Sequence, residues 1–362
     1  DNGLSMWVAD MDFRAPKIIQ EKLRGINSHG IYGYYGDHKE YNNSIKWWMK
    51  NRHNWEIDTS WIFTTHGLVN GTGLCIDAFT KPGDGIILFT PVYYQFSNLV
   101  EAARRKVVEC PLKLIDNHYP FDFVEYERNL SGDDKMVILC SPHNPGGRVW
   151  TKNELQEVAK FAKTHNLVLV SDEIHHDLVY PNKNHTVMPI ADPSVCDRLV
   201  MMTATTKTFN IAGAHSGNVI ISNPNLRQKF SQRIKALGIS PNSFGLFMAT
   251  AAYSPEGAEW LDELLHSIAG TRVMFETEVN KIPGLSSMPL EGTYLAWVDF
   301  SGTGMEEEEF IYRVQEKAKI AVNHGSTFGT GGEKYLRFNL ATPRTLVVEA
   351  TKRLKDAFSD LQ

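Results

Sequence analysis

The sequence has no long hydrophobic run, and no stretch approaches the roughly 18 to 20 consecutive apolar residues that a membrane-spanning helix requires. Its opening segment, DNGLSMWVAD, has neither the basic nor the apolar region of a secretion signal. These absences argue against membrane insertion and secretion. Because the chain begins with Asp1 rather than Met, we expect further residues to precede it in the natural gene product.

Cysteine is scarce, and charge of one sign is not in excess. The 4 cysteines form no CxxC pair in a chain too large to need cross-linking, so we expect free thiols and a cytoplasmic location. The 42 acidic and 37 basic residues give a formal net charge of -5, with no basic stripe for nucleic acid or an anionic membrane. A small-molecule partner is therefore expected.

The length and the overall composition are those of a folded enzyme-sized protein. A chain of 362 residues is longer than one hydrophobic core usually serves, which predicts two domains. Hydrophobic residues make up 42% of the chain and charged residues 22%, values typical of globular proteins. A disordered or fibrous chain is excluded.

Short apolar, β-branched runs alternate with segments of helical period between residues 61 and 222. This pattern predicts an α/β fold, in which helices cover a mainly parallel sheet of seven strands. The expected strands are WIFTT, GIILFT, KVVECP, MVILCS, LVLVS, LVMMT and NVIIS. The expected helices include Asn70 to Thr80, Tyr94 to Ala103 and Lys152 to His165, the last with a capping-box pattern at Thr151 and Glu154.

A second pattern follows a long helical stretch predicted for residues 242–281. The segments SSMPLEG, TYLAWVDF, IAV and YLRFN, with a charged helix around residues 306–319, predict a smaller α+β domain. The N-terminal segment has no place in the large sheet, so we expect it to pack on the smaller domain. The expected division is a large domain at 26–269 and a small domain made of 1–25 plus 270–362.

Polar residues that packing does not require stand at the ends of four predicted strands, where ligands bind in open α/β sheets. Taken singly, each has an ordinary explanation: Lys207 as a surface lysine, Asp172 as a cap, and Asn144 as part of a rigid turn. Arg337, inside the apolar run YLRFN, needs an anion from either an ion pair or a ligand.

Two other kinds of site find little support. His175 and His176 are not part of an HxH or HExxH pattern, so no metal site is predicted. A nicotinamide site is disfavoured because Gly71 and Gly73 lack the third glycine of a GxGxxG motif.

Together, an aspartate, an asparagine, a lysine and an arginine at these strand ends supply what pyridoxal phosphate chemistry requires. A lysine forms an imine with the aldehyde of the cofactor, and an aspartate keeps the pyridine nitrogen protonated. A guanidinium holds the substrate carboxylate as a bidentate pair. A helix start such as His66-Gly67-Leu68-Val69 can present backbone N–H groups to a phosphate.

Over nearly its whole length the chain resembles the fold-type I pyridoxal phosphate enzymes of the aminotransferase class I/II superfamily. Within that superfamily it looks like the MalY/PatB-type cystathionine β-lyases, also called carbon-sulfur lyases. The segments that carry this resemblance are WVADMDF, GIYGYYGD, NRHNWEI, SPHNPGGRVW, SDEIHHDLVY, KTFNIAG, EGTYLAWVDF and YLRFNLATPR.

The resemblance implies roles for individual residues. Lys207 resembles the imine lysine, Asp172 the partner of the pyridine nitrogen, and Tyr93 the aromatic residue that stacks on the ring. Asn144 resembles the donor to the cofactor's phenolic oxygen and lies next to the substrate. Arg337 resembles the arginine that binds the substrate carboxylate.

The resemblance also implies a phosphate site and a dimer. Gly67, Leu68 and Thr206 fall where the phosphate is usually held. Tyr34 matches the tyrosine that reaches across a dimer interface to the phosphate of the partner subunit, which implies a homodimer with shared active sites.

At three positions the chain departs from common patterns of the superfamily. His175, expected beside the cofactor, stands where many aminotransferases have Tyr, a replacement common in this branch. His215 stands in place of a phosphate-binding Arg, and Ala204 in place of a Ser. The hydroxyl of Thr203 or Thr206 could compensate for the missing serine.

The resemblance implies a carbon-sulfur β-lyase that depends on pyridoxal 5'-phosphate. Such an enzyme cleaves cystathionine or other cysteine S-conjugates to a thiol, pyruvate and ammonia, with Lys207 as the base that removes the α-proton. An aminotransferase uses the same residues and is the nearest alternative. A non-catalytic regulator that binds the cofactor is a further alternative, which the lack of an appended docking segment disfavours.

Overall fold

The computed structural model describes residues 2–361, and its larger part is built on a seven-stranded sheet. The strands lie in the order β2-β8-β7-β6-β5-β3-β4. Only β8 runs antiparallel to its neighbours, so the predicted mainly parallel sheet is confirmed. The strands are β2 (Ile62–Thr65), β3 (Gly85–Leu88), β4 (Lys106–Glu109), β5 (Asp134–Cys140), β6 (Val168–Asp172), β7 (Leu199–Thr203) and β8 (Gly217–Ile220).

Helices cover both faces of this sheet. Alternate strand residues point to opposite faces, and both sets are apolar, so each face needs a covering layer. Ile86 belongs to the core that α3, α4 and α9 cover, whereas its neighbour Ile87 belongs to the core that α6 covers. Helix α6 begins as predicted, since Thr151 Oγ1 accepts from the Glu154 N–H at 3.2 Å. The helices are α3 (Gly67–Phe79), α4 (Gln95–Ala102), α5 (Phe123–Tyr126), α6 (Lys152–Thr164), α7 (Met188–Ala191), α8 (Thr205–Thr208) and α9 (Pro224–Ala236).

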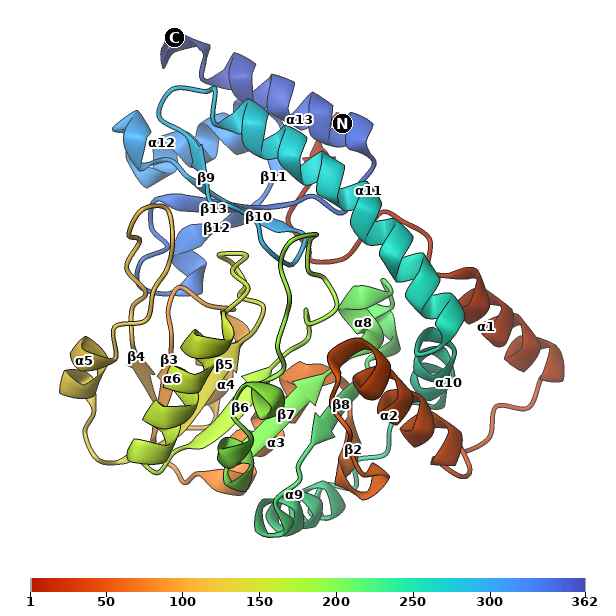
Figure 1. Ribbon diagram of the computed structural model, residues 1–362. Helices are drawn as coiled ribbons and strands as arrows, with labels where there is room; N and C mark the ends of the chain where they lie inside the picture. Colours follow the sequence, from red (N-terminus) through yellow and green to blue (C-terminus); the bar gives the residue numbers. More distant parts are fainter. Residues whose placement is uncertain (1, 362) are drawn as a thin grey trace.

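A smaller part, at the top of Figure 1, contains a four-stranded sheet in the order β12-β13-β10-β9. Strand β1 (Leu4–Ser5) pairs in parallel with β11 (Ile320–Ala321), which attaches the N-terminal segment to this part. The domain boundaries given above stay a prediction. The other elements here are β9 (Ser286–Ser287), β10 (Leu295–Asp299), β12 (Asn323–His324), β13 (Tyr335–Asn339), α12 (Glu307–Tyr312) and α13 (Arg344–Ala357).

The predicted single helical stretch over residues 242–281 is wrong, because the chain forms two helices there. Helix α10 (Ser243–Ala252) ends before Pro255, and α11 (Pro255–Val279) starts at that proline. Ser254 caps α11 by accepting from the Gly257 N–H at 3.1 Å. A proline at the first helical position lacks only an N–H that would have no intrahelical partner, which is why a helix readily begins there.

The remaining helices, α1 (Lys17–His29) and α2 (Lys39–His53), pack against α10 at one edge of the molecule. The connection between them extends outward at the right of Figure 1. Among residues 2–361, no helix combines the length and the apolar character that crossing a bilayer requires. Cys75, Cys110, Cys140 and Cys196 are all free thiols.

Candidate functional site

A cavity of about 320 Å³ opens at the carboxyl ends of the central strands. It contains every predicted site residue except Tyr34. The residues that line it and that sequence reasoning selected are Gly67, Leu68, Tyr93, Asn144, Asp172, His175, Thr206, Lys207 and Arg337. Strand ends and the loops that follow them therefore bring together side chains that lie far apart in the sequence.

Lys207 reaches the cavity from α8, the short helix that follows β7. Its Nζ donates a hydrogen bond to the carbonyl oxygen of Ala9 at 2.5 Å. Burial lowers the pKa of Lys207 to about 8, with a further contribution from the positive charge of Arg337. An amine with this pKa is substantially neutral in mildly alkaline solution, where it can attack a carbonyl carbon or accept a proton.

Asp172 is the last residue of β6 and is only 5% exposed. Its Oδ1 accepts a hydrogen bond from the Ile174 N–H at 3.1 Å. Burial raises the pKa of Asp172 to about 7. A cationic group in the cavity would keep this carboxylate ionised, because an opposite charge nearby favours the charged form.

Arg337 lies in the middle of β13 and is 3% exposed. Its Nη1 donates to Asn144 Oδ1 at 3.0 Å, and its Nη2 donates to Asn323 Oδ1 at 2.6 Å and to the Trp7 carbonyl at 2.9 Å. Burial lowers the pKa of Arg337 to about 10. These partners are neutral oxygens, so the buried positive charge is suited to an anionic ligand.

The bond from Arg337 also orients Asn144. Because Asn144 Oδ1 accepts from the guanidinium, the Nδ2 group of the same amide is the part that can donate to a ligand. This orientation agrees with the predicted role of Asn144 as a donor to a cofactor oxygen.

The N-terminus of α3 closes one end of the cavity. Gly67 begins this helix with φ of 79°, a backbone conformation that glycine adopts readily. Strand β8 passes close by at Gly217, where an added Cβ would lie 2.6 Å from Leu68 Cδ2 and 2.9 Å from the Gly67 carbonyl carbon. Gly67, Leu68 and Val69, the first residues of α3, line the cavity, and the start of a helix is a place where backbone N–H groups can bind a phosphate.

The two candidate replacements for the missing serine hydroxyl lie in different places. Thr203 Oγ1 accepts from Asn218 Nδ2 at 3.3 Å inside the sheet. Thr206 lines the cavity instead, next to Lys207. His215 is exposed at the same rim. The geometry therefore favours Thr206 for contact with a phosphate.

Tyr93 and His175 both line the cavity but differ in how far they are buried. The Tyr93 ring is half-buried and packs edge-on against Phe96 with 5.7 Å between ring centroids. His175 is buried, and its Nδ1 has no hydrogen-bond partner within residues 2–361. Burial, together with the charges of Lys207 and Arg337, lowers the pKa of His175 well below its usual value. The imidazole is therefore neutral.

Tyr34 lies outside the cavity, in the connection between α1 and α2 (Figure 1). Its side chain is 103% exposed. The predicted contact with a partner's phosphate needs a second chain, so that role stays a prediction.

Sequence reasoning assigned no role to several residues in the cavity wall or in contact with it. Trp7 and Ala9 contribute backbone carbonyls to Arg337 and Lys207, and Tyr294 Oη donates to the Ala9 carbonyl at 3.0 Å. All three lie in the segments WVADMDF and EGTYLAWVDF, which carried the family resemblance but no assigned chemistry. Asn323 is part of no such segment, and no pattern in the sequence points to it.

Comparison with known proteins agrees with this geometry. Residues 10–354 match the family "Aminotransferase class I and II". The chain is 36% identical to cystathionine beta-lyase PatB of Bacillus subtilis (strain 168), over 99% of this chain and 93% of that protein. The crystal structure of cystalysin from Treponema denticola, which contains a pyridoxal 5'-phosphate cofactor, superposes with a TM-score of 0.95 at 37% identity and covers 100% of this chain and 93% of that one.

A PLP-bound C-S lyase from Staphylococcus hominis superposes with a TM-score of 0.90 at 27% identity, over 98% of this chain and 90% of that one. The match extends over both the large sheet and the smaller part of the chain. The chain belongs to the class I and II aminotransferase family, and within it to the MalY/PatB branch.

Proposed function

We propose that this protein is a pyridoxal phosphate-dependent carbon-sulfur β-lyase. It cleaves cystathionine or a related cysteine S-conjugate, with one water molecule, to a thiol, pyruvate and ammonia. The observation that carries the proposal is the convergence of the Lys207 amine, the Asp172 carboxylate and the Arg337 guanidinium on one cavity. The named relatives with β-lyase activity support the choice of reaction.

The cavity residues fit this cofactor. Asp172 offers a buried carboxylate to the pyridine nitrogen, and the start of α3 offers N–H groups to the phosphate. Lys207 is the residue that would attach the cofactor covalently. When bound, pyridoxal phosphate supplies an electrophilic aldehyde and an electron-withdrawing ring that stabilises negative charge at the substrate α-carbon.

The chain's own residues then bind the substrate and move its proton. The Arg337 guanidinium pairs with the α-carboxylate, which holds the amino acid in one orientation. Lys207 Nζ takes the α-proton, since burial has lowered its pKa to about 8. The carbon-sulfur bond at the β-carbon breaks, and the sulfur leaves with the bonding electron pair. Tyr93 and Asn144, which line the same cavity, would hold the cofactor ring in one orientation relative to the substrate.

An aminotransferase is the alternative, because it needs the same lysine, aspartate and arginine. The distinguishing experiment supplies purified holoenzyme with cystathionine and measures thiol, pyruvate and ammonia together, with and without a 2-oxo acid acceptor. We expect the three products in equal amounts, unaffected by the acceptor. Amino transfer to the 2-oxo acid with no thiol from any β-sulfur substrate would establish the aminotransferase instead.

The assembly we propose is a homodimer located in the cytoplasm. An exposed apolar group at the α1–α2 connection supports the dimer: Ile31 is 70% exposed, Tyr32 60% and Tyr34 103%, and they lie beside Phe244 of α10. The free cysteines support a reducing compartment. Tyr34 would then reach the phosphate of the partner subunit.

A further inference from the structure

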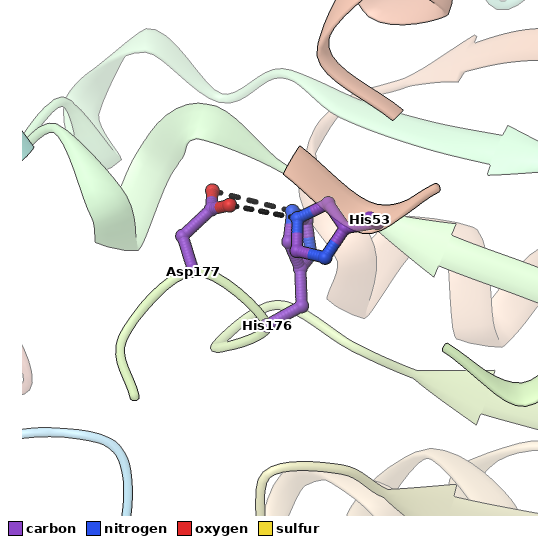
Figure 2. Close-up of side chains that lie close together, drawn as sticks. All are labelled: His53, His176 and Asp177. Carbon is purple, nitrogen blue, oxygen red and sulfur yellow. Dashed lines mark hydrogen bonds and ion pairs between the residues drawn. The ribbon is translucent and has the colours of Figure 1, made fainter. Parts of the chain in front are cut away.

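A second group of ionisable side chains is buried behind the cavity and is centred on Asp177. Figure 2 shows its carboxylate facing the rings of His53 and His176. Asp177 Oδ1 accepts from Trp48 Nε1 and His53 Nε2, both at 2.9 Å. Asp177 Oδ2 accepts from Thr208 Oγ1 at 2.9 Å and faces His176 Nε2 at 3.2 Å. Three side-chain donors from two helices, α2 and α8, therefore bond to this one carboxylate, and the His176 ring lies beside it.

The surroundings of His176 favour a positive charge on its ring. Its Nδ1 lies 2.6 Å from the carbonyl oxygen of Glu173, and its Nε2 faces a carboxylate oxygen. The carbonyl can only accept, so Nδ1 carries a proton, and the nearby Asp177 carboxylate favours the cationic form of the ring. Burial lowers the pKa of His176, but the Asp177 charge more than offsets this effect and the net shift is upward.

The pKa of His53 is shifted in the opposite direction from that of His176. Burial lowers the pKa of His53 to about 4, so this ring is neutral and donates through Nε2. Asp177 thus has a neutral donor in His53 and a neighbouring charge partner in His176.

The cluster is connected to both ends of the proposed cofactor site. Asp177 is the last residue of the turn that follows Asp172. Within that turn, His176 Nδ1 donates to the Glu173 carbonyl oxygen. Thr208 follows Lys207 directly in α8, and its hydroxyl donates to Asp177. One carboxylate thus links the segment that carries the pyridine partner to the helix that carries the amine.

We propose that Asp177, acting through the Thr208 hydroxyl, is a positioning residue that fixes Lys207 relative to Asp172. This inference rests on the proposed function, because the distance between these two groups matters only if one cofactor touches both. Thr208 is completely buried, so its hydroxyl has no solvent to bond to if the contact is lost.

The test compares four holoenzymes: wild type, Thr208→Val, Thr208→Ser and Thr351→Val. Thr351 is the matched control, since it is buried in α13 away from the cavity and donates to the Val348 carbonyl at 2.8 Å. The readouts are kcat, KM, the melting temperature and the circular dichroism of the cofactor absorption band. The dichroism reports how the cofactor is held and does not depend on turnover.

We expect Thr208→Val to lower kcat by about three- to tenfold, the equivalent of one hydrogen bond, with KM changed less than about twofold. The cofactor dichroism falls in the same variant. Thr208→Ser restores both values, whereas Thr351→Val leaves them as in wild type even if it lowers the melting temperature.

Three results would overturn the proposal: a Thr208→Val enzyme with wild-type kcat and dichroism, an equal loss in Thr351→Val, or a tightly bound divalent metal ion present in one equivalent. The last would show that His53, His176 and Asp177 serve a metal rather than Lys207. A wild-type protein with no cofactor dichroism at all would instead refute the proposed function.

Discussion

Two groups of buried charges lie next to each other in this molecule, and they differ in how their charges are balanced. In the cavity, Lys207 donates to a backbone carbonyl and Arg337 donates to neutral oxygens. In the cluster next to it, Asp177 accepts three hydrogen bonds and lies 3.2 Å from the ring of His176. Burial of a charge is costly unless a partner compensates it. The Lys207 and Arg337 charges, which lack a charged hydrogen-bond partner, are therefore available to a ligand. The Asp177 carboxylate is bonded within the protein and connects segments of the fold.

The same contrast appears in two aspartates of a single turn. The pKa of Asp172 is raised to about 7 because burial is the dominant effect. Burial also acts to raise the pKa of Asp177, but the His176 charge and the hydrogen bonds outweigh it, so the pKa lies well below its usual range. The neighbouring His176 charge and the hydrogen bonds decide the direction, since both side chains are buried to the same extent.

The largest effect is expected from removing the amine of the cavity. Lys207→Ala abolishes covalent attachment of the cofactor and lowers turnover by on the order of 10⁴-fold or more, because no other group supplies the nucleophile and base. Borohydride reduction followed by peptide mass spectrometry locates the attachment. Reduced cofactor recovered on a different lysine would show that the site is misassigned.

A smaller effect is expected for the buried guanidinium. Arg337→Ala raises KM by about 30-fold or more, since losing a buried charged contact costs roughly 2 to 5 kcal/mol, while cofactor affinity stays near that of wild type. Arg148→Ala is the control, because Arg148 is equally buried but forms ion pairs with Glu154 and Glu291. It lowers stability without the change in KM. Loss of cofactor and substrate affinity together in Arg337→Ala would assign Arg337 a structural role.

Much of the fold was predictable because its signals are local. The seven strands follow from short β-branched runs, and the start of α6 follows from the Thr151 and Glu154 pair. The break between α10 and α11 was missed, although Pro255 stood in the sequence, because the apolar periodicity continues on both sides of it. The antiparallel direction of β8 depends on the path of the preceding loop, which no periodicity encodes.

The site was predictable where a residue follows a strand or where a charge interrupts an apolar run, as Arg337 does. Asp172 comes directly after a predicted strand and Lys207 follows another within a few residues, and the ends of neighbouring parallel strands meet at one edge of a sheet. The contact between Ala9 and Lys207 joins segments at opposite ends of the chain, and it runs through a backbone carbonyl that any residue could provide. His53 and Asp177 likewise meet only through tertiary packing.

The most direct test replaces Asp172 and Asp177 by asparagine in two separate variants. It measures the free energy of unfolding of each cofactor-free protein between pH 5 and pH 8. The folded-state pKa of Asp172 lies above its unfolded value, so ionising this carboxyl lowers the free energy of unfolding of the wild type. The loss is absent below pH 4 and complete above pH 7. Asp172→Asn should therefore stabilise the protein by about 2 to 4 kcal/mol at pH 8, and by less as the pH falls. Asp177→Asn should destabilise it by about 3 to 5 kcal/mol throughout this range, because it leaves His176 without its counter-ion. Equal destabilisation by both substitutions at pH 8 would contradict the account, since Asp172 would then be a compensated structural charge rather than one reserved for a cationic ligand.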